Sequence, residues 1–271
     1  MQRIRITIAY DGTDFCGWQL QKGVRTVQGE LETAISRITG TQIRVHGSGR
    51  TDSGVHALGQ VVHFDVDDRM ASVPWQRALN SLLPDDITVL DCIPVSGDFH
   101  SRFNAVRKSY TYTLWLNNGF FLPWRRRYVW KCGPLDLEML DRGMEMFLGK
   151  HDFASFQNTG TPVSSTVREI YEFSRQSGQN RDEIVLRVCG SGFLKQMVRN
   201  MVGCLVEIGR GKADPGFVRS LLEKKDRTMA PATAPAQGLC LEAVYYGEEG
   251  CDGPDAGRKQ SHMENGHDGE V

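Results

Sequence analysis

The first hundred residues carry an ordered series of apolar and polar patterns. Isoleucines alternate with arginine and threonine over residues 4–8, as in a strand with one buried face. Apolar residues then recur at helical spacing over 27–38, with Thr26 in the N-cap position and Gly40 as the stop. Further patterns predict strands over 42–46 and 60–66, a helix over 73–83 and a strand over 87–95. The order β-α-β-β-α-β is typical of a ferredoxin-like lobe.

From residue 107 a similar series begins again, less regularly. The patterns predict strands over 109–116, 167–174, 183–189 and 239–246, and helices over 135–148, 193–208 and 215–225. The helix over 193–208 has the clearest apolar stripe, which leaves Arg199 on a polar face. We therefore predict an α+β fold of two ferredoxin-like lobes, residues 1–105 and 106–246, with an antiparallel or mixed sheet. No sequence repeat is strong enough to prove a duplication.

Charge divides unevenly along the chain. Residues 247–271 hold seven carboxylates against two basic side chains, a balance of −5 out of a net −1 for the whole chain. These residues are rich in glycine and poor in large apolar groups, so we predict a disordered acidic tail. The preceding residues then sum to +4, a mildly basic balance that permits nucleic acid as a partner without establishing it.

Cysteine spacing and apolar runs exclude several classes of protein. The seven cysteines are scattered and form no C-x-x-C pair, which argues against a zinc or redox site and favours reduced thiols. No apolar run is long enough for a membrane helix, and the first five residues are not followed by the apolar region of a signal peptide. We expect a soluble, cytoplasmic protein.

A glycine-rich loop at 46–57 carries the candidate chemistry. Three glycines within eight positions indicate a sharply bent backbone or a close approach by another molecule. The spacing does not fit a phosphate-binding loop, because no Gly-Lys-Ser/Thr occurs and a strand follows where a helix is needed. An aspartic protease would need two Asp-Thr-Gly loops. What remains is one carboxylate, Asp52, beside the guanidinium of Arg50; an ordinary Asx-turn is the structural alternative for Asp52.

Two further groups of residues stay open between structural and RNA-binding roles. Arginines at 125–127 stand between aromatic residues, as on many RNA-binding surfaces, but a solvated strand edge over buried aromatics explains them equally well. His56, His63 and His100 have no metal-ligand spacing, so we expect them to be structural or to face RNA.

Several motifs together resemble the tRNA pseudouridine synthase A family over nearly all of residues 3–246. They run in the family's order, and the Gly-Arg-Thr-Asp loop is highly specific. The motifs are Tyr10-Asp11-Gly12-Thr13, Gly17-Trp18-Gln19, Thr26-Val27-Gln28-Gly29, Gly49-Arg50-Thr51-Asp52-Ser53-Gly54-Val55-His56-Ala57, Asp98-Phe99-His100-Ser101-Arg102-Phe103, Lys108-Ser109-Tyr110, His151-Asp152-Phe153, Met197-Val198-Arg199-Asn200 and Thr233-Ala234-Pro235-Ala236.

The resemblance implies conversion of uridine to pseudouridine at positions 38, 39 and 40 of the tRNA anticodon arm. It also implies a homodimer without metal or organic cofactor and a positively charged cleft between the lobes. Asp52 matches the family's catalytic aspartate, Tyr110 its active-site tyrosine and Arg199 the arginine that pairs with the aspartate. The expected substrate-binding residues are Arg50, Thr51, His56, Arg102 and Tyr110. Lys195-Gln196 departs from the family pattern before Met-Val-Arg, and the acidic tail has no counterpart there.

Two other functions compete with this interpretation. One is a non-catalytic RNA-binding protein of paired ferredoxin-like lobes, whose usual aromatic signature is missing here. The other is a glycosidase that removes the base, which normally needs a second carboxylate in a comparable loop. If the resemblance holds, Arg199 should lie within ion-pair reach of Asp52. The sequence does not choose between attack of the carboxylate on C1′ and removal of the 2′ proton.

Overall fold

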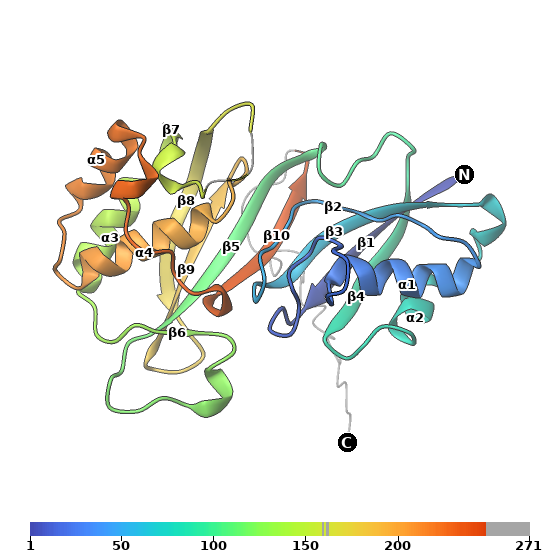
Figure 1. The fold of residues 1–271 in the computed structure, drawn as a ribbon, viewed down its shortest axis with the longest axis horizontal. Coiled ribbons are helices and arrows are strands. Elements are labelled where there is room, and N and C mark those ends of the chain that lie inside the picture. Colours follow the sequence, from blue (N-terminus) through green and yellow to red (C-terminus); the bar gives the residue numbers. More distant parts are fainter. Residues whose placement is uncertain (159, 161–162, 248–271) are drawn as a thin grey trace, which may run out of the picture.

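The computed structural model describes residues 1–158, 160 and 163–247, so the predicted tail lies outside the described residues except for Gly247. The fold is of the mixed α+β class. Its strands form one sheet in the order β4-β1-β3-β10-β5-β9-β8-β7, with β2 on β3 and β6 on β5. Helices α1 and α2 accompany the first strands, and α3, α4 and α5 gather at the other end of the sheet (Figure 1).

The predicted β-α-β-β-α-β order of the first hundred residues is confirmed. The elements are β1 (Gln2–Tyr10), α1 (Val27–Thr39), β2 (His46–Gly47), β3 (His56–Val66), α2 (Trp75–Asn80) and β4 (Ile87–Val95). Their pairing, β4-β1-β3-β2 and antiparallel throughout, is the ferredoxin-like strand order. Helix α1 begins and ends as predicted, because the Thr26 hydroxyl accepts from Gly29 N–H and Gly40 closes the helix at a φ of 70°.

The strand predicted over 42–46 was wrong at all positions but His46. The backbone of Val45 is bonded to side chains of helix α1 instead of a neighbouring strand. Its N–H donates to Glu32 Oε1 at 3.1 Å, and its carbonyl accepts from Gln28 Nε2 at 3.5 Å. The adjacent Arg44 and His46 are exposed, and Ile43 packs against the same hydrophobic cluster as α1.

The second half repeats the same strand order as β10-β5-β9-β8. Its elements are β5 (Ala105–Trp115), β6 (Trp130–Lys131), α3 (Leu137–Glu145), β7 (Gly149–Asp152), β8 (Val167–Ser177), β9 (Glu183–Gly190), α4 (Met197–Gly209), α5 (Gly216–Lys224) and β10 (Leu239–Tyr246). Short 3₁₀ turns lie at η1 (Asp68–Met70), η2 (Pro123–Arg125), η3 (Ala154–Phe156), η4 (Arg227–Met229) and η5 (Ala236–Gly238). Helix α4 begins four residues later than predicted, after Gln196 at a φ of 59°. Strand β7 was not predicted.

Buried side chains form two hydrophobic clusters, one packed around α1 and β1, the other around α4 and β9. Tyr110 on β5 packs against both. The two halves of the sheet meet where β10 pairs in parallel with the first residues of β3, His56 and Ala57. The other end of the same β3 edge is taken by β2. The loop of residues 48–55 therefore leaves the sheet beside the junction of the two halves.

His63, a buried residue of β3, should make the protein less stable at acid pH. Burial lowers its pKa to about 4, helped by the positive charges of His100, Arg3 and His46, with Asp65 acting in the opposite direction. The unfolded chain binds this proton near pH 6.5, so the free energy of unfolding should fall by about 2 kcal/mol as the pH falls from 6.5 towards 4.5. His63→Gln does not titrate and should show a flatter profile in urea melts at several pH values.

The half-exposed His151, changed to glutamine, serves as the control and should keep the wild-type pH profile. Parallel profiles for wild type and His63→Gln would contradict the assignment of the acid sensitivity to His63.

Candidate active site

The backbone of residues 12–18 holds the glycine-rich loop from one side. A Cβ on Gly12 would lie 2.0 Å from the carbonyl oxygen of Val55, and one on Gly17 would lie 2.7 Å from that of Thr51. Trp18 N–H donates to the Thr51 carbonyl at 3.1 Å. Glycine is needed at both positions because the two segments approach backbone to backbone.

A tight turn presents Asp52 at the tip of the loop. Val55 N–H donates to the main-chain oxygen of Asp52 at 3.2 Å, and Gly54 takes a φ of 78°. The buried Thr51 hydroxyl is hydrogen-bonded to the Tyr10 hydroxyl at 2.8 Å. The turn is therefore closed by main-chain groups and fixed by Thr51, which leaves the Asp52 carboxylate to face another partner.

That partner is Arg199, as the sequence predicted. Arg199 Nη1 lies 3.1 Å from Asp52 Oδ2, across 147 residues of chain. The arginine is 14% exposed and the aspartate 30%. Arg199 Nε donates to the Ala234 carbonyl at 2.7 Å, which holds the guanidinium in one orientation. A mostly covered carboxylate thus lies at the junction of the two halves and faces a guanidinium of fixed orientation.

Tyr110 lies beside this pair on β5. Burial raises the pKa of its phenol, and the negative charge of Asp52 raises it further. Its ring packs edge-on against Phe193, with the ring centroids 5.2 Å apart. At neutral pH the phenol therefore keeps its proton and offers an aromatic face and a hydrogen-bond donor.

The other predicted substrate-binding residues lie in different surroundings. Arg50 and Arg102 are exposed, and Thr51 is bonded to Tyr10 within the protein. His56 is buried: its Nδ1 accepts from Gly12 N–H at 3.1 Å, and its Nε2 lies 2.9 Å from the Arg127 carbonyl. His56 therefore connects Gly12 with Arg127. That these four residues bind substrate stays a prediction.

Lys108 also contacts the glycine-rich loop, and the sequence indicated it only as part of a motif. Its Nζ donates to the Ser48 carbonyl at 2.7 Å, at the start of the loop. Burial lowers the pKa of this amine to about 8, and the charges of Arg102 and Arg168 add to the effect. Lys108 precedes Tyr110 by two residues on one strand, so the period-2 pattern places both on one face. That spacing was the signal available in the sequence.

Gly12→Ala should damage the fold at the loop. The added Cβ would meet the Val55 carbonyl far inside contact distance, so one backbone must move, and we expect a loss of about 2–4 kcal/mol in the free energy of unfolding. Urea melts measure it. Gly97→Ala is the matched control, since a Cβ there meets nothing within 4 Å. Equal stability of the two variants would contradict the close approach.

Among residues 1–158, 160 and 163–247, no group of three or more His, Cys, Asp or Glu is arranged to hold a metal ion. Over the same residues, every helix is too short or too polar to cross a membrane.

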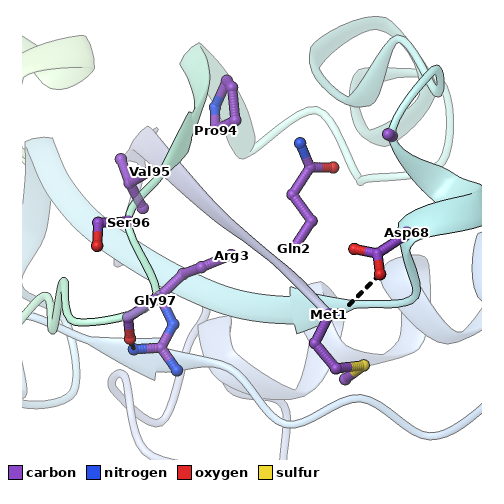
Figure 2. A pocket seen from close by; sticks show the side chains of 9 residues that line it. Met1, Gln2, Arg3, Asp68, Pro94, Val95, Ser96 and Gly97 are labelled. Atoms are coloured by element: carbon purple, nitrogen blue, oxygen red, sulfur yellow. Dashed lines mark hydrogen bonds and ion pairs between the residues drawn. The ribbon is translucent and has the colours of Figure 1, made fainter.

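Two surface cavities lie away from Asp52. The first, of about 430 Å³, is formed by the start of β1 and the end of β4 (Figure 2), where the amino group of Met1 pairs with Asp68 at 3.0 Å. The second, of about 600 Å³, lies between the end of α3 and α5. Asp52, Tyr110 and Arg199 line neither cavity.

Comparison with known proteins decides the family. A family model described as tRNA pseudouridine synthase matches residues 6–104 and 144–247. The chain belongs to the tRNA pseudouridine synthase family. A protein named tRNA pseudouridine synthase A from Maridesulfovibrio salexigens is 73% identical over 262 residues, covering 96% of this chain and 97% of that protein. Its namesake from Solidesulfovibrio magneticus is 55% identical, covering 93% and 94%. The resemblance drawn from the motifs is confirmed, and the protein is an isomerase of this family.

Two of the three predicted catalytic residues, Asp52 and Arg199, lie in the parts of the chain that the family model matches. Tyr110 lies in the stretch between these two parts. A solved structure titled as an archaeal box H/ACA Nop10-Cbf5 complex aligns at a TM-score of 0.35 and 13% identity, over 75% of this chain and 43% of that one. A similarity this low carries no argument about the site.

Proposed function

We propose that the protein isomerises uridine to pseudouridine in tRNA, with Asp52 as the catalytic carboxylate. The observation that supports it is the Asp52–Arg199 pair, a charged carboxylate held on a bent loop at the junction of the two halves. The reaction breaks the bond from C1′ to N1, turns the uracil and joins C5 to C1′. N1 gains a proton and C5 loses one, so no oxidant or outside group is required.

Asp52 begins the reaction in one of two ways. Its carboxylate attacks C1′ and forms a covalent sugar adduct, or it removes the 2′ proton and forms a glycal. Both routes need an ionised carboxylate with a fixed orientation, and the bond from Arg199 Nη1 to Oδ2 fixes that orientation. Tyr110 keeps its proton, so we assign it to stacking on the uracil and to hydrogen-bond donation rather than to proton removal.

The proposal extends to substrate and assembly. We assign the two halves to two ferredoxin-like lobes, residues 1–105 and 106–246, with a positively charged cleft for RNA between them. The target uridines are those at positions 38, 39 and 40 of the anticodon arm, bound by a cytoplasmic homodimer. A stacked uridine must be turned outwards to reach Asp52, at a cost of a few kcal/mol that contacts to the RNA backbone offset. Exposed Arg50 and Arg102 supply such contacts.

Unmodified tRNA transcripts provide the test. After incubation with the protein, we expect pseudouridine at positions 38–40 by chemical mapping, with no change in the mass of the RNA. Release of free uracil would instead assign a glycosidase, and tight binding of tRNA without any pseudouridine would assign a non-catalytic RNA-binding protein.

A further inference from the structure

The arginine run at 125–127 is divided by the fold into residues with different tasks. Arg125 is an internal anchor: its Nε lies 2.6 Å from Glu183 Oε1, on a glutamate side chain with 0% exposure. Arg127 faces Asp14, with 3.4 Å between Nη1 and Oδ2. Arg125 and Arg127 therefore each pair with a carboxylate of the protein itself.

The third arginine of the run, Arg126, faces solvent, as does Trp124, the residue just before the run. Trp124 is the middle residue of turn η2 and is 69% exposed, while the other four tryptophans of the chain are buried or half-buried. Arg126 is exposed, and within the described residues no carboxylate pairs with its guanidinium. An exposed indole close in sequence to an exposed guanidinium without a carboxylate partner offers a ring for stacking and a charge for phosphate, the two groups that single-stranded nucleic acid sites combine.

The turn that carries this pair is fixed beside the candidate active site. The Arg127 carbonyl lies 2.9 Å from His56 Nε2, and the Tyr128 hydroxyl donates to Asp11 Oδ2 at 2.8 Å. The rings of His56 and Tyr128 are also in contact, with their centroids 5.2 Å apart. His56 directly follows the loop that presents Asp52, so its contacts with Arg127 and Tyr128 tie the turn to that loop.

The same ties limit the separation of Trp124 from Asp52. Four residues lead from Asp52 to His56 and three from Arg127 to Trp124, so even a fully extended chain keeps their Cα atoms within about 35 Å. That span corresponds to about ten stacked base steps of a nucleic acid strand.

We propose that Trp124 and Arg126 form a second RNA-binding site for the same tRNA, in which the indole stacks on an unpaired base and the guanidinium binds a neighbouring phosphate. The inference rests on the proposed function for the identity of the RNA. The base lies within about ten steps of the target uridine, which places it in the arm that carries the target or in the segments that join it. Residues 105–143 lie between the two parts matched by the family model, so this contact belongs to a stretch that the match leaves unassigned.

The test compares Trp124→Ala and Trp124→Phe in steady-state and single-turnover assays on a tRNA transcript. Because stacking on an aromatic ring contributes substantially per base, Trp124→Ala should raise KM by about 5- to 100-fold. The single-turnover rate at saturating tRNA should stay at the wild-type value. Trp124→Phe keeps a ring and should recover most of the lost affinity. An unchanged KM in Trp124→Ala would overturn the proposal, whether or not the saturating rate falls.

The charge is tested separately with Arg126→Ala against Arg77→Ala. Arg77 is exposed on α2, so its removal changes net charge equally at a place remote from the turn. In binding assays on tRNA, Arg126→Ala should lower the slope of log K against log salt by about 1, and Arg77→Ala should leave it unchanged. Equal slopes in the two variants would overturn the phosphate contact.

Binding assays also separate this inference from the proposed reaction. If wild type forms no pseudouridine but Trp124→Ala still binds tRNA more weakly than wild type, the proposed reaction fails and the RNA contact stands. If wild type forms pseudouridine and Trp124→Ala changes only the oligomeric state in sedimentation, the exposed indole contacts protein and the inference fails.

Discussion

Asp52→Asn is expected to abolish pseudouridine formation while the fold and tRNA binding survive. The amide has nearly the shape of the carboxylate and still accepts a hydrogen bond from Arg199, but it neither attacks C1′ nor removes a proton. We expect turnover to fall by at least about 10³-fold. Because C5 loses its hydrogen when it joins C1′, release of tritium from tRNA labelled at C5 of uridine measures the rate directly.

Asp85→Asn is the matched control for this variant. Asp85 is an exposed carboxylate in the turn before β4, so its change removes the same charge without touching the loop. It should keep wild-type turnover. Circular dichroism and filter binding check that Asp52→Asn folds and binds tRNA, and substantial turnover in a folded Asp52→Asn would refute the proposed role of the carboxylate.

Arg199→Ala is expected to have the second largest effect, on turnover more than on affinity. Its loss leaves the mostly covered Asp52 carboxylate without a counter-charge and removes the Nε donor to the Ala234 carbonyl. We expect kcat to fall by about 10²- to 10³-fold with little change in KM. Arg199→Lys should recover only part of the loss, because an ammonium does not reproduce both contacts of the guanidinium.

Arg210→Ala provides a close control at the other end of α4. Arg210 also binds one carboxylate, Glu207 at 3.0 Å, and one carbonyl, that of Cys132 at 2.9 Å. Its removal should cost stability without a specific loss of turnover. If Arg199→Ala instead raises KM, reduces the salt dependence of binding and keeps the saturating rate, the arginine binds phosphate and does not serve Asp52.

Local signals in the sequence sufficed for elements whose ends depend on adjacent residues. Thr26 and Gly40 cap α1 through bonds inside the helix, and the sequence placed both ends within a residue. The strand expected over 42–46 failed because Glu32 and Gln28, on that helix, take the backbone groups of Val45. Such a competition between side chains and strands depends on packing, which the local pattern does not contain.

The site could be predicted in part for the same reason. The bent loop around Asp52 was visible in its glycines, and the apolar stripe of the helix placed Arg199 on a polar face. That this face meets Asp52 followed from the resemblance alone. The division of the 125–127 run was not visible, because Glu183 and Asp14 reach it from distant parts of the chain. Residue type alone does not tell an anchoring arginine from a free one.

The position of β10 has a consequence for the order in which the protein becomes competent during synthesis. β10 is the last strand of the described chain, yet it lies in the middle of the sheet between β3 and β5. A nascent chain can pair β1, β3 and β4 early, since those strands are close in sequence. The strand after the Asp52 loop nevertheless lacks its neighbour β10 until the last residues are made, so a chain cut off shortly before residue 239 contains Asp52 and Arg199 but not the strand that joins the two halves.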